Sequence, residues 1–154
     1  MNPEPARPSD FPSIVRLLSE AALPHDDLTP EHLRHFLVLR DADGGIAGVV
    51  GMEVAEDAGL LRSLAIPAAR RGGGLASRLV DALEAHARAA GIRTLYLLTT
   101  TAEGFFARRG YAPADRAAVP DPIAATAEFR SICPASAACM ARTLVPARES
   151  AAVA

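Results

Sequence analysis

At 154 residues the chain is long enough for a compact domain with a substantial core. Half of its residues are hydrophobic, 22% are charged and the net charge is only −2, which excludes a disordered chain and gives no basic surface for nucleic acid. No apolar run approaches the roughly 18 residues of a membrane helix, and the first residues lack the apolar core of a signal peptide, so we expect a cytoplasmic protein with no membrane partner.

The chain contains 16 arginines and no lysine. The absence of lysine excludes lysine Schiff-base chemistry and the lysine-dependent phosphate loop. The two cysteines, Cys133 and Cys139, are expected to be reduced packing residues. A redox or metalloid-binding role for this pair is the alternative.

The N-terminal part of the chain predicts two helices. Asp10 is a suitable N-cap for the first helix, apolar residues then recur at helical spacing, and Pro24 ends the run. Thr29 is a suitable N-cap for a second, shorter helix, with Pro30 at its first position.

Three strands follow these helices. Segments 36–40 and 46–54 flank the turn "DADGG" and predict a β-hairpin. Segment 60–66 predicts the third strand, which ends at Pro67 because proline cannot donate a hydrogen bond to the ladder.

The second half of the chain predicts further helices alternating with strands. A helix begins at Leu75 and ends before Gly91. The other expected elements are strands at 93–98, 111–113 and 138–144, a helix at 102–110 and a helical turn at 123–129. This order indicates an α/β fold with one mixed central sheet flanked by helices. We assign residues 1–145 to a single domain and 146–154 to a flexible C-terminal tail.

The stretch "RRGGGLAS", residues 70–77, places three glycines between a strand and a helix. Such a bend can present backbone N–H groups to phosphate oxygens at the positive end of the helix, although it can also be a simple tight turn. The dinucleotide fingerprint fits poorly, because no acidic residue follows the next strand.

A third type of phosphate loop matches better. Arg71, Gly74 and Ala76 fit the R/Q-x-x-G-x-G/A pattern of the GNAT acetyltransferases, "RPSDFPSIVRLL" resembles the opening of that family, and "FFARRGY" resembles its F-Y-x-x-x-G-F segment. These segments occur in the family's order. The resemblance implies the GNAT fold, acetyl-CoA as co-substrate and no metal, and it allows a homodimer.

Two narrower resemblances bear on the acceptor. "LLTTTAEGFFARRGY" is similar to bacterial amino-acid N-acetyltransferases of the N-acetylglutamate synthase type, and the pattern from "LLRSLAI" to "IAATAEFRSICPASAACM" resembles the arsenic-resistance (ArsN-type) N-acetyltransferases. They imply direct acetyl transfer, in a ternary complex, to the amine of a small amino acid or of a toxin such as arsinothricin or phosphinothricin.

The family resemblance also implies contacts with CoA. The backbone of Leu64 and Ile66 should bind the pantetheine arm, and an N–H near Leu64 should face the acetyl oxygen. Phe106 stands where the family has a tyrosine that faces the thiolate, so water or the acceptor's own ammonium must supply that proton. The implied CoA-binding residues are Leu64, Ala65, Ile66, Arg71, Gly72, Gly73, Gly74, Leu75, Ala76, Ser77 and Phe106.

Two carboxylates are candidates for the general base. Glu53 lies in an otherwise apolar strand, where partial burial favours the proton-accepting role, although it can equally be a solvated outward-facing residue. Glu103 is the weaker candidate, because it also suits the first turn of a helix. Tyr111 is expected to pack.

An amino-acid acceptor also needs a partner for its carboxylate. Arg62, next to Ser63, interrupts an apolar strand, and Arg130 lies in the segment that closes the acceptor site in related enzymes; structural salt bridges are the alternative for both. His25 is expected to border the acceptor pocket. The three histidines and two aspartates of residues 25–35 match no compact zinc pattern, so we predict no metal site.

Two further functions stay open from the sequence. The missing tyrosine allows a non-catalytic acyl-CoA-binding sensor, and the cysteine pair allows an arsenical-binding protein.

Overall fold

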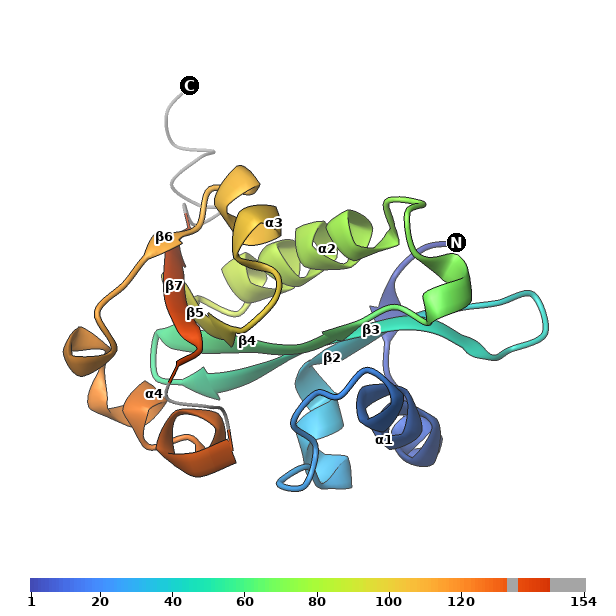
Figure 1. The fold of residues 1–154 in the computed structure, drawn as a ribbon. Coiled ribbons are helices and arrows are strands. Elements are labelled where there is room, and N and C mark those ends of the chain that lie inside the picture. Colours follow the sequence, from blue (N-terminus) through green and yellow to red (C-terminus); the bar gives the residue numbers. More distant parts are fainter. Residues whose placement is uncertain (133–135, 145–154) are drawn as a thin grey trace. The chain divides into compact units, whose positions relative to one another are not determined.

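The computed structural model describes residues 1–132 and 136–144. Its strands form one mixed sheet in the order β1-β2-β3-β4-β5-β7-β6, with helices beside it, as predicted (Figure 1). The β4–β5 pair is parallel, whereas the β2–β3 and β5–β7 pairs are antiparallel. Cys133 and the predicted tail 146–154 lie outside the described residues.

The elements follow the predicted order. The strands are β1 (Glu4–Pro5), β2 (Phe36–Arg40), β3 (Ile46–Ala55), β4 (Ala58–Ala65), β5 (Thr94–Thr99), β6 (Ala112–Pro113) and β7 (Ala138–Thr143). The α-helices are α1 (Phe11–Glu20), α2 (Leu75–Ala89), α3 (Glu103–Arg108) and α4 (Asp121–Ala124). Shorter 3-10 helices occupy Pro8–Asp10, Pro30–His35, Ala68–Arg70 and Arg116–Ala118, and a π-helix occupies Glu128–Ile132. None of the helices in the described part of the chain has the length and apolar character needed to cross a membrane.

The chain divides into two compact units. Unit 1 comprises Met1–Glu53 and Leu61–Ala85, and unit 2 comprises Val54–Leu60 and His86–Ala154. Unit 1 therefore holds α1, β2, most of β3, the end of β4 and the start of α2. Unit 2 holds the start of β4 together with β5, α3, α4 and β7.

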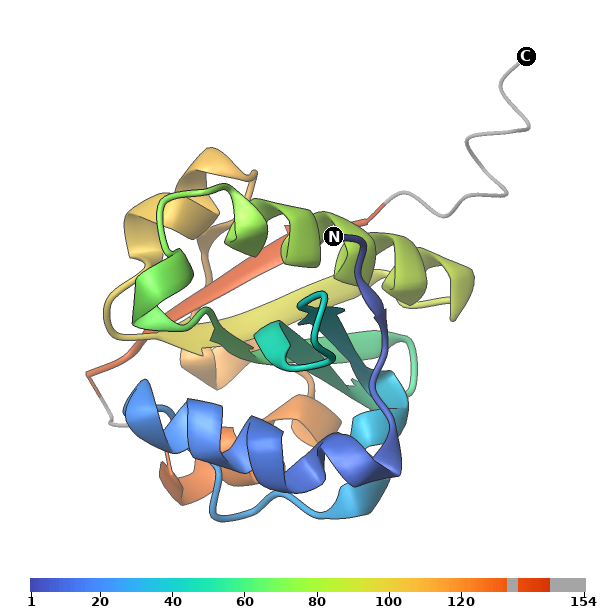
Figure 2. The ribbon, with the colours of Figure 1, turned by 90° about the vertical axis from the view of Figure 1, so that its right-hand side faces the viewer.

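The β2–β3 hairpin of unit 1 buries both of its faces. Val38 and Val49 lie opposite each other and pack in one core cluster with apolar residues of α1. The neighbouring pair, Leu39 and Gly48, lies toward the opposite face of the hairpin. The evidence is that a Cβ atom at Gly48 would lie 3.0 Å from a methyl group of Leu79 in α2. Since side chains alternate along a strand, α1 and the start of α2 cover opposite faces of the hairpin (Figure 2).

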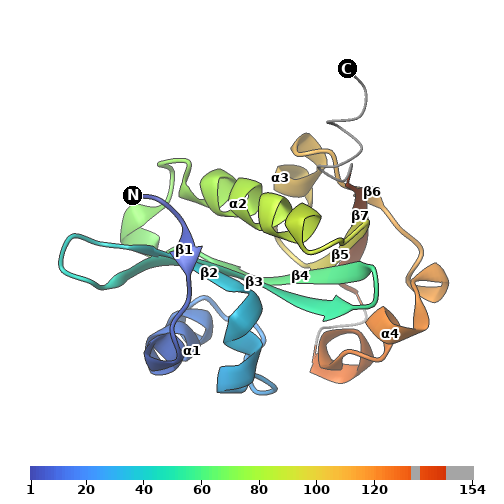
Figure 3. The ribbon, with the colours of Figure 1, turned by 180° about the vertical axis from the view of Figure 1, so that it is seen from behind.

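The N-terminal edge of unit 1 is held by Arg40 at the end of β2. Strand β1, which the sequence did not predict, pairs antiparallel with β2 (Figure 3). Asp10 stands at the predicted N-cap of α1, but its carboxylate accepts hydrogen bonds from Arg40 and from the Arg7 backbone N–H instead of capping the helix. The hydrogen bond from Arg40 outweighs the opposing effect of burial and lowers the pKa of Asp10.

Unit 2 is organised around β7. Its ladder with β5 runs from the Thr94–Thr143 pair to the Thr99–Ala138 pair, and β6 pairs with β7 as well. The helical turn predicted at 123–129 consists of two elements, α4 and the π-helix. A core cluster of this unit contains Ala58, Leu60, Val119, Ile123 and Cys139.

Candidate active site

The glycine loop of unit 1 joins the end of β4 to α2. Gly72 (φ 88°) and Gly74 (φ 77°) adopt left-handed backbone conformations that other residues rarely occupy, whereas Gly73 does not. An added Cβ atom would meet nothing within 4 Å at Gly72 or Gly74. Backbone conformation therefore requires glycine at positions 72 and 74 of the loop.

Arg71 braces this loop. Its Nε donates a 3.0 Å hydrogen bond to the Ile66 carbonyl oxygen, so the Arg71 side chain folds back onto the end of β4. The Ile66 backbone, which is expected to bind the pantetheine arm, thus also accepts this hydrogen bond through its carbonyl oxygen. At the other end of the loop, the Arg78 N–H donates to the Gly74 carbonyl (3.2 Å), which begins the hydrogen bonding of α2. The loop thus ends at the amino terminus of a helix, where an anion is favoured.

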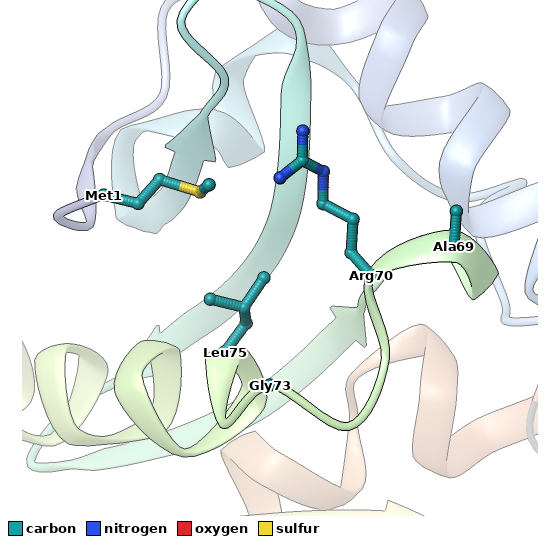
Figure 4. A pocket seen from close by; sticks show the side chains of 5 residues that line it. All are labelled: Met1, Ala69, Arg70, Gly73 and Leu75. Carbon is teal, nitrogen blue, oxygen red and sulfur yellow. The ribbon is translucent and has the colours of Figure 1, made fainter.

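A pocket of about 470 Å³ adjoins the loop (Figure 4). The side chains of Met1, Arg70 and Leu75 converge around it, and Ala69 and Gly73 complete its lining. The guanidinium of Arg70 also forms an ion pair with Asp41. An open backbone bend with a cationic side chain and a hollow beside it fits the pyrophosphate of a nucleotide cofactor.

The residues predicted to bind CoA differ in their exposure. Leu64, Leu75, Ala76 and Ser77 are half-buried, Ala65 and Ile66 are buried, and Arg71, Gly72, Gly73 and Gly74 are exposed.

Strand β4 contains a strained residue immediately before Leu64. Ser63 is buried and has φ 62°, a left-handed conformation that is costly for a residue with a side chain. Its Oγ accepts a 3.1 Å hydrogen bond from Nε of Arg62. Because a left-handed residue interrupts the regular alternation of a strand, it redirects the backbone groups that follow it. This feature supports the expectation that an N–H near Leu64 faces the acetyl group, which stays a prediction.

Arg62 is fully buried and its guanidinium is committed to two carboxylates. Its Nη1 donates to Asp27 Oδ2 and to Glu53 Oε2, each at 2.7 Å, and its Nη2 donates to Asp27 Oδ1 at 2.9 Å. Arg62 was expected to receive the carboxylate of an acceptor. The structure shows the alternative role, a structural salt bridge, because a buried cation needs partners and the protein itself supplies them; binding of an acceptor carboxylate by Arg62 stays a prediction.

The carboxylate of Asp27 is ionised within this cluster. Burial raises its pKa, but the hydrogen bonds and charge of Arg62 outweigh burial and leave the pKa of Asp27 below its usual value. Two carboxylates and one guanidinium leave one net negative charge.

The same cluster contains possible metal ligands. Ligand atoms of Asp27, His32 and Glu53 lie within 4.8 Å of one another. However, Nη1 of Arg62 sits 2.7 Å from an oxygen of each carboxylate, so a metal cation would meet the guanidinium charge. The donor set therefore does not fit a metal ion.

The structure brings Glu53, Arg62 and Ser63 together but keeps His25 out of their cluster. The His25 ring contacts the Leu23 carbonyl oxygen (3.0 Å) and lies 3.5 Å from Asp26. Arg130 is exposed in the π-helix of unit 2.

Phe106 is part of an aromatic cluster in unit 2. It is only 4% exposed, and its ring packs edge to face against Phe105 (5.1 Å between centroids) and Tyr111 (5.3 Å). The packing role expected of Tyr111 is confirmed, and the predicted contact of Phe106 with CoA stays a prediction. Glu103 is exposed in the first turn of α3. A carboxylate at this position stabilises the helix N-terminus.

Cys139 is a free, buried cysteine, and burial raises the pKa of its thiol. Its expected partner in a metalloid site, Cys133, lies outside the described residues. Packing is therefore the role that the described environment of Cys139 supports.

Sequence reasoning did not assign Asp27 and His32 to the site. Both lie between α1 and β2, in the light blue segment of Figure 2. The signal for His32 was its position three residues after Thr29, which is the position of the reciprocal partner in a capping box. No sequence signal pairs Asp27 with Arg62, which is 35 positions away.

The fold and the glycine loop define the class of protein: an α/β enzyme fold with an anion-binding bend between a strand and a helix. The chain belongs to the GNAT acetyltransferase family, since the family model of the acetyltransferase (GNAT) domain matches residues 32–113.

Similar proteins include curated amino-acid acetyltransferases. Over 57 residues, the chain is 44% identical to the enzyme of Azotobacter vinelandii and 42% identical to that of Pseudomonas fluorescens. These matches cover 37% of this chain and 13% of each relative, so the chain spans only a small part of their length.

Solved structures extend the similarity to almost the whole chain. N-acetylglutamate synthase from Neisseria gonorrhoeae, complexed with coenzyme A and N-acetyl-glutamate, matches with a TM-score of 0.81 and 25% identity, over 94% of this chain and 35% of that one. Rv2747 from Mycobacterium tuberculosis, in complex with CoA, matches with a TM-score of 0.79 and 25% identity, over 94% of this chain and 100% of that one.

Proposed function

We propose that this protein transfers the acetyl group of acetyl-CoA to the amino group of a small amino acid or amino-acid analogue. The observation that carries the proposal is the position of Glu53. Its part-exposed carboxylate accepts a hydrogen bond from Arg62. Arg62 directly precedes the strained Ser63 in β4, the strand that leads into the glycine loop. A proton acceptor is thereby fixed beside the strand that is expected to hold the thioester.

The proposed reaction is a direct transfer. Glu53 removes a proton from the acceptor's ammonium, and the freed nitrogen lone pair attacks the thioester carbonyl carbon. As the new C–N bond forms, the C–S bond breaks and the sulfur leaves with its electron pair. Because Phe106 has no hydroxyl group, the proton for this sulfur comes from water or from the acylated nitrogen.

The net charge around Glu53 supports an acceptor that carries an ammonium group. The cluster of Asp27, Glu53 and Arg62 carries one net negative charge, which a cationic amine would neutralise. An amino acid also carries a carboxylate, which needs a hydrogen-bond donor of its own. Amino acids are further supported as acceptors by the two curated relatives, which are amino-acid acetyltransferases.

The narrower resemblance to the ArsN-type enzymes adds arsinic and phosphinic amino-acid analogues to the proposed acceptors. Such compounds share the amino-acid head group and differ in their acidic side chain, so the same glutamate would serve as base for them.

An acceptor screen tests the proposal. The purified protein is mixed with acetyl-CoA and a panel of amino acids, including glutamate, phosphinothricin and arsinothricin, and the release of free thiol is measured against a sample without acceptor. We expect thiol release that depends on an acceptor and an acetylated product detectable by mass spectrometry. CoA binding in calorimetry without thiol release from any acceptor of the panel would contradict the proposal and favour the sensor function.

A further inference from the structure

Glu53 and His32 each leave one polar atom without a hydrogen bond within the described part of the chain. Oε2 of Glu53 is held by Arg62, so Oε1 is the oxygen that remains available. This Oε1 lies 4.0 Å from Nε2 of His32. The separation is too long for a hydrogen bond, and both side chains are partly exposed, at 20% for Glu53 and 26% for His32.

The hydrogen bonds of Thr29 fix the protonation pattern of His32. The Thr29 backbone N–H donates to Nδ1 of His32 at 3.0 Å, and the Thr29 hydroxyl lies 3.0 Å from the same atom. Because Nδ1 accepts the N–H, neutral His32 carries its hydrogen on Nε2. His32 therefore presents a donor toward Glu53, which presents an acceptor.

Local packing holds the two groups in place. His32 lies in the 3-10 helix that runs directly into β2, and the first residue of β2, Phe36, pairs with Gly51 of β3. A Cβ atom at Gly51 would lie 2.2 Å from the Phe36 ring, so only glycine admits this contact. Glu53 is two residues further along the same strand. The donor and the acceptor are thus positioned by backbone structure before any ligand arrives.

We propose that His32 and Glu53 together bind the head group of an α-amino acid. Nε2–H of His32 donates to the acceptor's carboxylate, while Oε1 of Glu53 accepts from its ammonium. This inference rests on the proposed function and deepens it, because it restricts the acceptor to compounds with both groups on one carbon.

The surrounding charges are compatible with a zwitterion. Asp27 is the other carboxylate near His32, and its charge is offset by the bidentate contact with Arg62. The neutral head group of an amino acid adds no net charge to this arrangement. An amine without a carboxylate would lack the hydrogen bond from His32, which weakens binding by roughly tenfold.

Titration calorimetry on the CoA-saturated protein tests this assignment. The ligands are the amino acids of the acceptor panel and the amines that their decarboxylation would give. For wild type we expect α-amino acids to bind at least about tenfold more tightly than the matching amines. No binding of any panel amino acid, or no preference over the amines, would overturn the inference.

Three variants separate the role of His32 from a structural role. His32→Asn keeps an acceptor for the Thr29 N–H but is too short to reach the ligand, so we expect it to fold and to lose the preference for α-amino acids. His32→Gln restores an N–H near the position of Nε2 and should regain part of that preference. Arg34→Gln, on an exposed residue of the same 3-10 helix, should leave the preference unchanged.

Specific results would contradict the proposed contact between His32 and the carboxylate. An unchanged preference in His32→Asn, or an equal loss in Arg34→Gln, would show that His32 does not contact the carboxylate. Thiol release is measured in parallel: a protein that binds amino acids with the expected preference but releases no thiol would contradict the proposed function while supporting this inference.

Discussion

At the scale of single residues, Arg62 determines which oxygen atoms of Asp27 and Glu53 are engaged in hydrogen bonds. A fully buried guanidinium is costly unless carboxylates surround it, and Asp27 and Glu53 do so at hydrogen-bonding distance. By binding one oxygen of Glu53, Arg62 leaves the other oxygen available for the proposed role of base. The same side chain therefore contributes to stability and to the geometry of the proposed base.

Asp27→Asn should destabilise the protein by about 2 kcal/mol at neutral pH, because it removes a charged hydrogen-bonding partner from a buried arginine. The folded-state pKa of Asp27 lies below its ordinary value of 3.8, so the unfolded chain binds the proton more tightly. The stabilisation by Asp27 is therefore complete above the unfolded pKa and is lost as pH falls through the folded pKa. Urea unfolding of wild type and variant should show a difference that shrinks below about pH 4.

Asp26→Asn is the matched control for this change. The Asp26 side chain is 94% exposed, so the substitution should alter the free energy of unfolding by less than about 0.5 kcal/mol. Equal effects of the two substitutions would show that the Arg62 contact adds nothing to stability.

Glu53→Gln should lower kcat by roughly 100-fold or more, because an amide cannot accept the acceptor's proton. The amide oxygen can still accept the Arg62 hydrogen bond, so CoA affinity should stay near the wild-type value. Steady-state kinetics with thiol detection measures the first quantity and calorimetry with CoA the second. A kcat within a factor of two or so of wild type would remove Glu53 from the role of base.

At the scale of elements, the glycine loop offers a comparison between adjacent glycines. Gly74→Ala places a side chain on a residue with φ 77°, which should cost roughly 1–2 kcal/mol and redirect the backbone N–H groups at the start of α2. Gly73→Ala meets no left-handed conformation, and the nearest atom to its Cβ is the Arg70 carbonyl oxygen at 3.9 Å. Calorimetry should therefore find CoA affinity strongly reduced in Gly74→Ala and little changed in Gly73→Ala. The reverse order would place the cradle elsewhere in the loop.

The elements themselves were largely predictable, because hydrophobic periodicity, proline and glycine mark their ends locally. The helix from Leu75, the hairpin around residues 41–45 and the final strand at 138–143 all stand where these signals put them. Strand β1 was missed because two residues carry no periodic signal. The left-handed conformation of Ser63 was also missed, since nothing in the residue type announces it.

The site was predictable only where it is continuous in the sequence. The segment from Leu64 to Ser77 could be proposed as a unit because its chemistry lies in consecutive backbone groups. The partners of Arg62 could not, because they come from a loop and from a neighbouring strand that only the fold brings together. A buried charge in a strand predicts that partners exist but does not identify them.

At the scale of the whole molecule, the two units should respond differently to acid. Asp10 and Asp27, two carboxylates of the described residues whose pKa values are lowered, belong to unit 1. Protonating them removes stability as pH falls through their folded pKa values, whereas the raised pKa of Cys139 in unit 2 has no effect in acid.

Hydrogen exchange after incubation near pH 3 tests this difference. We expect amides of α1 and β2 in unit 1 to lose protection before those of β5 and β7 in unit 2. Simultaneous loss throughout the chain would show that acid unfolds the two units as one.

The division of the chain also sets an order of events during synthesis. Every residue of unit 1 precedes His86, so the ribosome delivers that unit complete while most of unit 2 is still untranslated. Residues 58–60, by contrast, are made early and must wait for β5, their parallel partner at residues 94–96. A pause in translation after unit 1 has emerged would let the Arg62 cluster and the glycine loop form first, with the first three residues of β4 still unpaired on their β5 side.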